Sequence, residues 1–168
     1  TLIEADVSGK NPVDITLEKS VEDFFKRNDF NSLILFSAYT DVDGAEAQRS
    51  DENGICWQIN VNGVKNIVNA CVKYNRKLIF ISTDFVFDGK KGPYKEDEPT
   101  GKNPKDISWY GITKIEGENH IQKNLKDAVI IRISYPFRGR FELKDDVLKR
   151  VLKLAKENSL YPMFADQK

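Results

Sequence analysis

The sequence predicts an α/β protein built on a doubly wound parallel sheet. The prediction depends on three short, nearly unbroken runs of β-favouring apolar residues, at 32–38, 77–83 and 127–134. Such runs suit strands that are buried on both faces of a parallel sheet. Helical patterns lie between and after them, and this alternation is typical of right-handed βαβ units with helices on both faces of the sheet.

Each helix is predicted from apolar residues that repeat on one face. The clearest stripe lies in 58–75, at positions i, i+3, i+4, i+7 and i+8: Val64, Ile67, Val68, Cys71 and Val72. The segments 18–28 and 143–157 have similar stripes, which indicate two more amphipathic helices. The short segments 2–6 and 12–16 are predicted to be two further strands.

A long polar loop is predicted at 88–107, where three glycines and three prolines interrupt any regular pattern. The loop leaves the carboxyl end of the 77–83 strand. In open α/β sheets, ligands bind outside the carboxyl ends of the strands. We therefore expect this loop to border a ligand site.

Composition narrows the functional class. A chain of 168 residues with 40% hydrophobic and 31% charged residues is typical of one soluble globular domain. The formal net charge of +0 provides no basic surface for nucleic acid.

No apolar run approaches the ~18 residues of a membrane span, and the chain does not open like a signal peptide. Cys56 and Cys71 lack metal-binding spacing, so we expect reduced thiols, no metal site and a cytoplasmic protein.

The stretch "SWYGITKIEGE" (108–118) places Tyr110 four residues before Lys114 at a predicted helix start. Residues at i and i+4 share one helix face. The 77–83 strand ends in Ser-Thr-Asp, so Thr83 is expected at the same edge of the sheet. A Tyr-x-x-x-Lys pair arises readily by chance in a lysine-rich chain, and by itself it also fits a solvated helix face.

Further segments resemble motifs of one family along nearly the whole chain: "AYTDVDGAE" (38–46), "INVNGVKNIVNAC" (59–71), "ISTDFVFDG" (81–89), "GPYKEDEP" (92–99), "WYGITKIEGE" (109–118) and "FADQ" (164–167). Together they resemble the extended short-chain dehydrogenase/reductases, and more narrowly the dTDP-4-dehydrorhamnose reductases. The resemblance implies a Rossmann-like domain that reduces a nucleotide-linked 4-keto-6-deoxy sugar with NADPH or NADH.

The resemblance also implies roles for four residues. Tyr110 would donate a proton to the developing alkoxide, and Thr83 would hydrogen-bond the reacting carbonyl. Lys114 would lower the pKa of Tyr110, which is about 10 for a free tyrosine, and would hold the nicotinamide ribose hydroxyls. Asn60 matches a family asparagine that fixes the local backbone and a proton-relay water.

Ligand contacts carry over from the motifs in the same way. The expected cofactor contacts are Asp14 and Ile15 beside the adenine, Ser37, Ala38 and Tyr39 at a strand end, and Lys114. Asp6 is a candidate for the adenosine ribose, and the alternative is an ordinary turn carboxylate. Candidate substrate contacts are Asp84, Phe85, Val86 and Tyr135, although the last three fit simple packing equally well.

The sequence also departs from the family. It contains no G-x-x-G-x-x-G turn of the kind that holds a pyrophosphate at a helix N-terminus, and most of the expected substrate domain is absent. We therefore interpret 1–168 as a partial NAD(P)-binding domain, with 135–168 leading into the substrate region. The isolated chain is expected to bind dinucleotide weakly or not at all, and so to be inactive by itself.

Several alternatives remain open from the sequence. A nucleotide-sugar epimerase or dehydratase of the same superfamily would share most of these motifs, although "STDFVFDG" favours a reductase. A non-catalytic regulatory subunit could keep the fold without the chemistry. Retention of Thr83, Tyr110 and Lys114 together argues against an inert subunit. The expected partner is a nucleotide sugar, and a homodimer is left open.

Overall fold

The computed structural model describes residues 2–137 and 146–159. The chain divides into two compact units, one formed by 1–88 with 99–132 and the other by 89–98 with 133–168. The "FADQ" segment (164–167) lies outside the described residues. The candidate catalytic residues all belong to the first unit.

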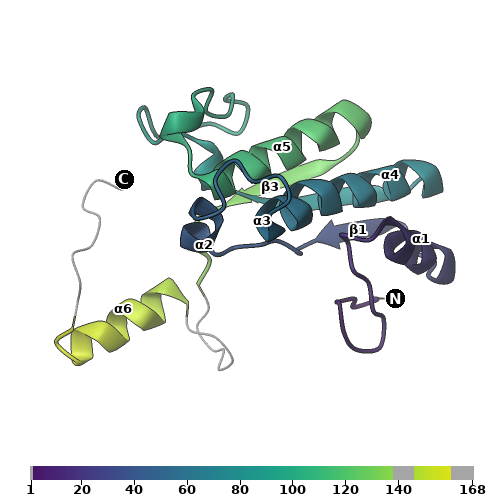
Figure 1. Ribbon diagram of the computed structural model, residues 1–168, viewed down its shortest axis with the longest axis horizontal. Coiled ribbons are helices and arrows are strands. Elements are labelled where there is room, and N and C mark those ends of the chain that lie inside the picture. Colours follow the sequence, from purple (N-terminus) through teal and green to yellow (C-terminus); the bar gives the residue numbers. More distant parts are fainter. Residues whose placement is uncertain (1, 138–145, 160–168) are drawn as a thin grey trace. The chain divides into compact units, whose positions relative to one another are not determined.

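A three-stranded parallel sheet forms the centre of the first unit, with the strand order β1–β2–β3 (Figure 1). The strands are β1 (Ser32–Leu35), β2 (Lys77–Thr83) and β3 (Val129–Ile133). β1 and β2 pair in parallel from Ser32 opposite Lys77 to Leu35 opposite Phe80. The predicted α/β class and the predicted neighbouring strands are therefore confirmed.

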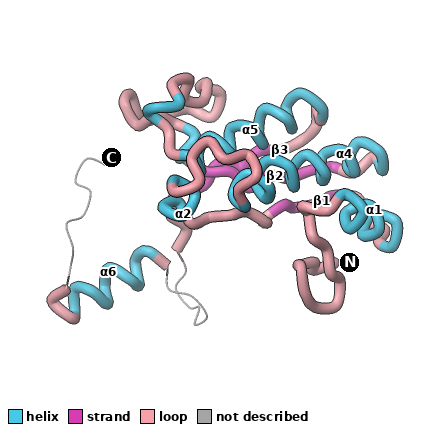
Figure 2. Tube along the Cα trace, viewed as in Figure 1, coloured by secondary structure: helices cyan, strands magenta, loops and turns pink. Residues whose placement is uncertain are grey.

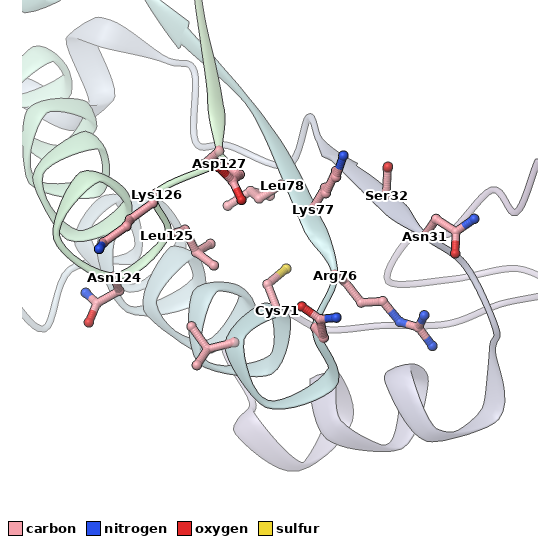
Figure 3. Close-up of a pocket in the computed structure, with 13 residues that line it drawn as sticks. Asn31, Ser32, Cys71, Arg76, Lys77, Leu78, Asn124, Leu125, Lys126 and Asp127 are labelled. Carbon is pink, nitrogen blue, oxygen red and sulfur yellow. The ribbon is translucent and has the colours of Figure 1, made fainter.

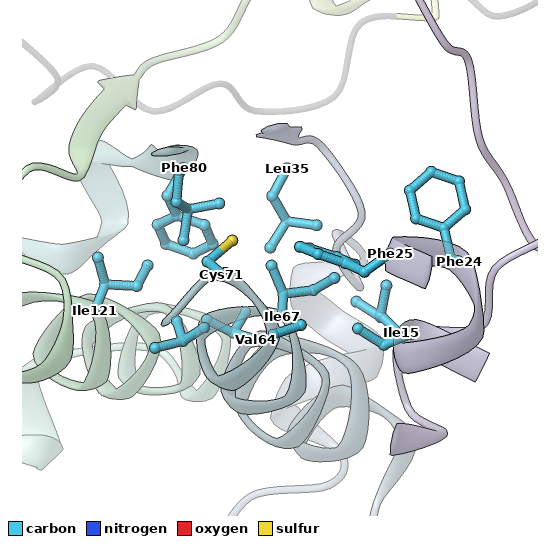
Figure 4. Close-up of a cluster of buried hydrophobic side chains, with 13 residues drawn as sticks. Ile15, Phe24, Phe25, Leu35, Val64, Ile67, Cys71, Phe80 and Ile121 are labelled. Carbon is cyan, nitrogen blue, oxygen red and sulfur yellow. The ribbon is translucent and has the colours of Figure 1, made fainter. Parts of the chain in front are cut away.

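Three helices pack against the sheet: α1 (Glu18–Arg27) and α4 (Val64–Tyr74), which are amphipathic, and α5 (Trp109–Asn124), which buries a mixed set of side chains. Figure 4 shows Leu35 and Phe80 directed from the strands toward side chains of these helices. The buried cluster includes Phe24 and Phe25 of α1, Val64, Ile67, Val68 and Cys71 of α4, and Ile121 of α5. The stripes read from the sequence in 18–28 and 58–75 thus form one core on this face of the sheet, together with Ile121 of α5.

The opposite face of the sheet is largely open among the described residues. Ile34, Val129 and Ile131 are 49%, 51% and 42% exposed. Successive side chains of a strand point to opposite faces, so Ile34 lies on the face away from its buried neighbour Leu35. Parallel sheets are usually covered on both faces, whereas the helices of the first unit cover one.

The predicted helix 58–75 is composite. A short helix α3 (Ile55–Trp57) continues into a π-helix, η1 (Gln58–Gly63), and then into α4. Gly63 lies against the side chain of Ile15, where an added Cβ would come within 2.7 Å of Ile15 Cγ1. The period of the apolar residues does not reveal the wider π turn, because the stripe that defines the pattern lies mainly in α4.

The strands predicted at 2–6 and 12–16 are wrong. These segments make a single isolated parallel bridge between Asp6 and Pro12, with the Val13 N–H donating to the Asp6 carbonyl at 2.7 Å. A strand requires a partner along several residues, and no described strand lies beside these segments to provide one.

Short elements join the main ones in the first unit. They are the helix α2 (Val42–Glu46) and two 3₁₀ turns, η2 (Asp84–Val86) and η3 (Pro104–Asp106). Apart from η3, the predicted loop 88–107 has no helix or strand. Figure 2 shows it as a mainly irregular segment before α5.

The second unit contains the helix α6 (Val147–Lys156), close to the predicted 143–157. The Asp146 side chain caps it by accepting the Lys149 N–H at 3.0 Å. Within the parts of the chain that the structure describes, no helix is long and apolar enough to cross a membrane.

Candidate active site

The candidate site is built around the first turns of α5. Ser108 caps the helix by accepting the Gly111 N–H at 3.1 Å, which is the usual role of a serine at this position. Tyr110, Lys114 and Glu118 follow at intervals of four residues, so they lie on one face of the helix. This face is directed toward the carboxyl end of β2, as the sequence predicted.

Gly111 lets α5 come close to the chain that follows β2. A Cβ at this position would lie 2.3 Å from the Phe85 carbonyl oxygen and 2.8 Å from Ile107 Cγ2. Because the nearer obstacle is backbone, it cannot move aside as a flexible side chain would. The glycine after Tyr110 therefore keeps the helix against the turn that contains Thr83 and Phe85.

Replacing Gly111 with alanine should lower the free energy of unfolding by ~1–3 kcal/mol, as overpacking of a tight contact does. Gly→Ala within a helix normally stabilises a protein, so the sign of the effect is diagnostic. Denaturant unfolding of the full-length protein measures it. Asn119→Ala, at an exposed position on the same helix, should be neutral or slightly stabilising. A stabilising Gly111→Ala would contradict the close approach.

Thr83 and Tyr110 come together at the end of β2. Thr83 is 6% exposed, and its hydroxyl accepts the Phe85 N–H at 3.2 Å. The Phe85 ring meets the Tyr110 ring edge-on, with centroids 5.9 Å apart. Burial is the main influence on Tyr110 and raises the pKa of its phenol, while a hydrogen bond with the Thr83 side chain opposes the increase. The phenol therefore keeps its proton at neutral pH, as a proton donor must.

Lys114 is buried more deeply than the sequence indicated. It is 2% exposed; its ammonium donates to the Ile81 carbonyl at 2.8 Å and lies 4.0 Å from the centre of the Phe80 ring. Burial lowers the pKa of Lys114 to about 8, and the charge of Glu118 opposes the decrease. The expected lowering of the Tyr110 pKa by Lys114 is not found in this arrangement, because burial of the phenol dominates and the ammonium is directed at β2.

Asn60 lies in the π-helix and hydrogen-bonds to two other segments of the site, the chain after β1 and the start of α5. Its side-chain oxygen accepts the Tyr39 N–H at 2.8 Å, and its nitrogen donates to the Tyr39 carbonyl at 3.1 Å and to Thr113 Oγ1 at 3.0 Å. Thr113 in turn donates to the Tyr110 carbonyl at 2.8 Å. Asn60 thus fixes the chain that follows β1 relative to the first turn of α5, which is the backbone role that the family resemblance implied.

The other predicted cofactor contacts lie outside this cluster of hydrogen bonds. The Asp14 carboxylate accepts the N–H and the hydroxyl of Thr16, at 2.9 and 2.7 Å. Ile15 is buried in the core, and Asp6 is exposed and accepts the Val7 N–H at 2.6 Å. Ser37 is exposed and Ala38 half-buried in the stretch between β1 and Tyr39.

The predicted substrate contacts also separate. Asp84 and Phe85 lie beside Thr83 at the site, with Thr83 Oγ1 donating to Asp84 Oδ1 at 3.1 Å. Val86 is fully buried, which favours packing over contact with a ligand. Tyr135 belongs to the second unit and is 43% exposed there.

A pocket of the first unit lies at the other end of the sheet from the candidate site. It has a volume of about 600 Å³, and Ser32, Lys77 and Ala128, at the amino ends of the three strands, line it together with Arg76 and Asp127 (Figure 3). Ligands of open α/β sheets bind at the carboxyl ends, so we do not assign this pocket to the site. Among the described residues no group of three or more His, Cys, Asp or Glu side chains is arranged to hold a metal ion.

Sequence reasoning gave no role to a buried polar cluster beside the site, formed by Ser82, Glu118 and Arg132. Glu118 accepts from the Ser82 hydroxyl at 2.5 Å and from Arg132 Nη2 at 2.6 Å. Two signals could have revealed it: Glu118 continues the four-residue spacing of Tyr110 and Lys114, and Arg132 interrupts an apolar strand.

A parallel α/β sheet, a Ser-Thr at the end of a central strand and a Tyr-x-x-x-Lys on the helix behind it together define an extended short-chain dehydrogenase/reductase. A family model described as the RmlD substrate binding domain matches residues 3–168. The chain belongs to this family.

Known proteins similar to the chain support this assignment. A dTDP-4-dehydrorhamnose reductase of Aggregatibacter actinomycetemcomitans is 34% identical over 165 residues, covering 98% of this chain and 50% of the relative. The crystal structure of a dTDP-4-dehydrorhamnose reductase of Bacillus anthracis in complex with NADP has a TM-score of 0.74 at 29% identity, covering 86% of this chain and 48% of that one. The chain thus spans about half the length of the reductases it matches.

A third relative has a different kind of name. Methionine adenosyltransferase 2 subunit beta of Bos taurus is 37% identical over 76 residues, which cover 45% of this chain and 22% of the relative. The similarity therefore extends to a protein that is named as a subunit rather than as a reductase.

Proposed function

We propose that this chain carries the proton-transfer residues of an NAD(P)H-dependent reductase acting on a nucleotide-linked 4-keto-6-deoxy sugar. The observation that carries the proposal is the contact between buried Thr83 and half-buried Tyr110, with the ammonium of Lys114 one helical turn further along α5. Residues 1–168 then form part of a dinucleotide-binding domain, and 135–168 lead toward the substrate region.

Each residue of the site has a distinct task in this reaction. The Thr83 hydroxyl orients the keto oxygen of the sugar toward the phenol of Tyr110. Tyr110 gives its proton to that oxygen as negative charge develops, and a positioned acid of this kind typically contributes ~10²–10⁴-fold to the rate. Asn60 keeps the Tyr39 backbone and the Tyr110 turn in a fixed relation, so the donor does not have to be ordered during the reaction.

NADPH or NADH, when bound, supplies the hydride. The residues present fit the nicotinamide end of such a cofactor, since an ammonium has three N–H donors and Lys114 directs one of them to the Ile81 carbonyl. The others can meet ribose hydroxyls. Ser37, Ala38 and Tyr39 would line the cofactor after β1, and their position is fixed through both backbone groups of Tyr39.

A non-catalytic regulatory subunit is the second candidate, favoured by the similarity to the methionine adenosyltransferase subunit. An epimerase or dehydratase of the same superfamily is the third. Retention of Thr83, Tyr110 and Lys114 together at the end of β2 supports catalysis over the subunit. For the whole protein we propose a cytoplasmic location, in keeping with the free thiols of Cys56 and Cys71, and no nucleic-acid partner. A homodimer remains open.

The three candidates differ in what a single assay should record. Full-length protein is mixed with NADPH or NADH and dTDP-4-keto-6-deoxy sugar, the nicotinamide absorbance is followed, and the sugar product is identified. A reductase oxidises one cofactor for each sugar alcohol formed. An epimerase or dehydratase changes the sugar without net oxidation of the cofactor, and a regulatory subunit does neither. Either of the last two results would overturn the proposal.

A further inference from the structure

The polar cluster of Ser82, Glu118 and Arg132 joins three elements inside the first unit. Glu118 on α5 is 1% exposed. It accepts from the Ser82 hydroxyl of β2 at 2.5 Å and from Arg132 of β3 through Nε at 3.1 Å and Nη2 at 2.6 Å. The Arg132 guanidinium also lies 5.0 Å from the centre of the Phe87 ring. The carboxylate is therefore paired with a cation and hydrogen-bonded to both neighbouring strands.

Two members of the cluster are neighbours of candidate-site residues along the chain. Ser82 directly precedes Thr83 at the end of β2, and Glu118 lies one turn beyond Lys114 on the same face of α5. A shift of α5 along β2 would therefore break the Ser82–Glu118 bond and the Thr83–Tyr110 contact together. The two contacts fix the same helix to the same strand end.

Stability alone does not account for a buried ion pair at this place. Removing two charges from water costs about as much as their attraction returns, and well-packed apolar residues often hold such elements equally well or better. An apolar trio at these positions would keep the sheet and helix together. A buried carboxylate adds a fixed negative charge close to Lys114, which an apolar trio would not.

Of the charges near Lys114, that of Glu118 most strongly opposes the lowering of the lysine pKa by burial. Glu118 on its own helix and Cys56 on α3 act to raise the pKa of Lys114, against the larger effect of burial. The β2 groups beside the ammonium, the Phe80 ring and the Ile81 carbonyl, are uncharged. Of the other groups that face α5, Asp84 on η2 acts on Tyr110 and Glu46 on α2 accepts the Trp109 N–H at 2.8 Å.

We propose that the Ser82–Glu118–Arg132 cluster is the positioning device of this site. Ser82 and Glu118 set β2 against α5 so that Thr83 stays on the Tyr110 phenol, and the Glu118 carboxylate places a negative charge one helical turn from the Lys114 ammonium. The catalytic part of this inference rests on the proposed reductase function, whereas the effect of Glu118 on Lys114 can be measured without turnover.

Glu118→Gln in the full-length protein tests the electrostatic part. Without the carboxylate the ammonium is less favoured, so the alkaline limb of kcat/KM should move to lower pH by roughly one unit, with up to about tenfold lower kcat/KM at pH 8. Nuclear magnetic resonance titration of the Lys114 ammonium should show the same shift. Glu116→Gln, an exposed carboxylate on the same helix, is the control and should shift neither.

Ser82→Ala tests the positional part and removes only a hydroxyl. Because Thr83 is then misplaced, kcat should fall by roughly tenfold. The charges of Glu118 and Arg132 remain, so the alkaline limb of the pH profile should stay in place. If Glu118→Gln does not fold, Ser82→Ala still decides, because wild-type kcat in that variant would overturn the positioning role.

The outcomes separate this inference from the proposed function. If the wild type turns over the keto sugar but Glu118→Gln leaves the Lys114 titration and the alkaline limb unchanged, the inference is overturned and the proposed function stands. If the wild type shows no turnover but the Lys114 titration shifts in Glu118→Gln, the proposed function fails, and the electrostatic role of Glu118 stands.

Discussion

Tyr110→Phe should leave the protein folded and lower turnover of the keto sugar by ~10²–10⁴-fold, the range for a lost general acid. The aromatic ring that packs edge-on against Phe85 is kept, so the variant loses a hydroxyl and its bond with Thr83. Loss of one such hydrogen bond costs about 0.5–1.5 kcal/mol. Cofactor affinity should stay close to wild type because the phenol acts on the substrate oxygen.

The control for this variant is Tyr74→Phe. Tyr74 ends α4, and its hydroxyl is buried without a hydrogen-bond partner in the described structure. Its removal should leave turnover unchanged and stability unchanged or slightly higher. Steady-state kinetics, cofactor binding by calorimetry and denaturant unfolding are measured for both variants. Near-wild-type turnover in Tyr110→Phe would mean that the Tyr-x-x-x-Lys spacing arose by chance, and it would favour the regulatory-subunit candidate.

Lys114→Met should abolish most activity and yet stabilise the protein near neutral pH. Methionine keeps the length of the side chain but removes both the positive charge and the donors proposed for the cofactor. We expect turnover to fall by ~10²-fold or more and cofactor binding to weaken, since the lysine serves both steps. Lys123→Met, at an exposed position in the last turn of α5, should change neither.

The stability effect of Lys114→Met has a defined pH dependence. The pKa of Lys114 is lowered to about 8 in the folded protein, from an ordinary value of 10.5. Between these values the unfolded chain binds more protons than the folded one, so this lysine makes the wild type more stable as pH rises from 8 to 10.5. The variant should therefore exceed the wild type by on the order of 1–3 kcal/mol at pH 7, and this difference should shrink at pH 10. A pH-independent difference would contradict the buried-ammonium account.

The strands and helices of the core were largely predictable because their burial leaves a strong pattern. The run at 77–83 became β2 without change, since apolar, β-favouring residues fill its centre. The segments 2–6 and 12–16 are less apolar and have no strand beside them, and neighbours distant in sequence decide whether such a short run becomes a strand. The open face of the sheet could not be predicted either, because an apolar residue in a strand does not show whether a helix covers that face of the sheet.

The residues of the site were predictable, but their electrostatic relations were not. Spacing and motif placed Thr83, Tyr110 and Lys114 at one edge of the sheet. The depth of Lys114 and its bond to the Ile81 carbonyl depend on how closely α5 approaches β2. That approach depends on the space left by Gly111 and on the link from Glu118 to Ser82; the spacing of Glu118 on α5 marks the residue, but it does not identify its partner on β2.

The π-helix before α4 takes up one more residue than a regular helix would hold in the same place. Its six residues, Gln58–Gly63, contain a wider turn than an α-helix has, inserted between α3 and α4. In a regular α-helix one added residue rotates everything before it by about 100° around the axis, and the wider turn absorbs that rotation. Cys56 Sγ, on the N-terminal side, thereby keeps its place 3.6 Å from Thr113 Oγ1. Insertion of a further residue in this segment should therefore turn Cys56 away from Thr113, whereas substitutions on its outer surface should be tolerated.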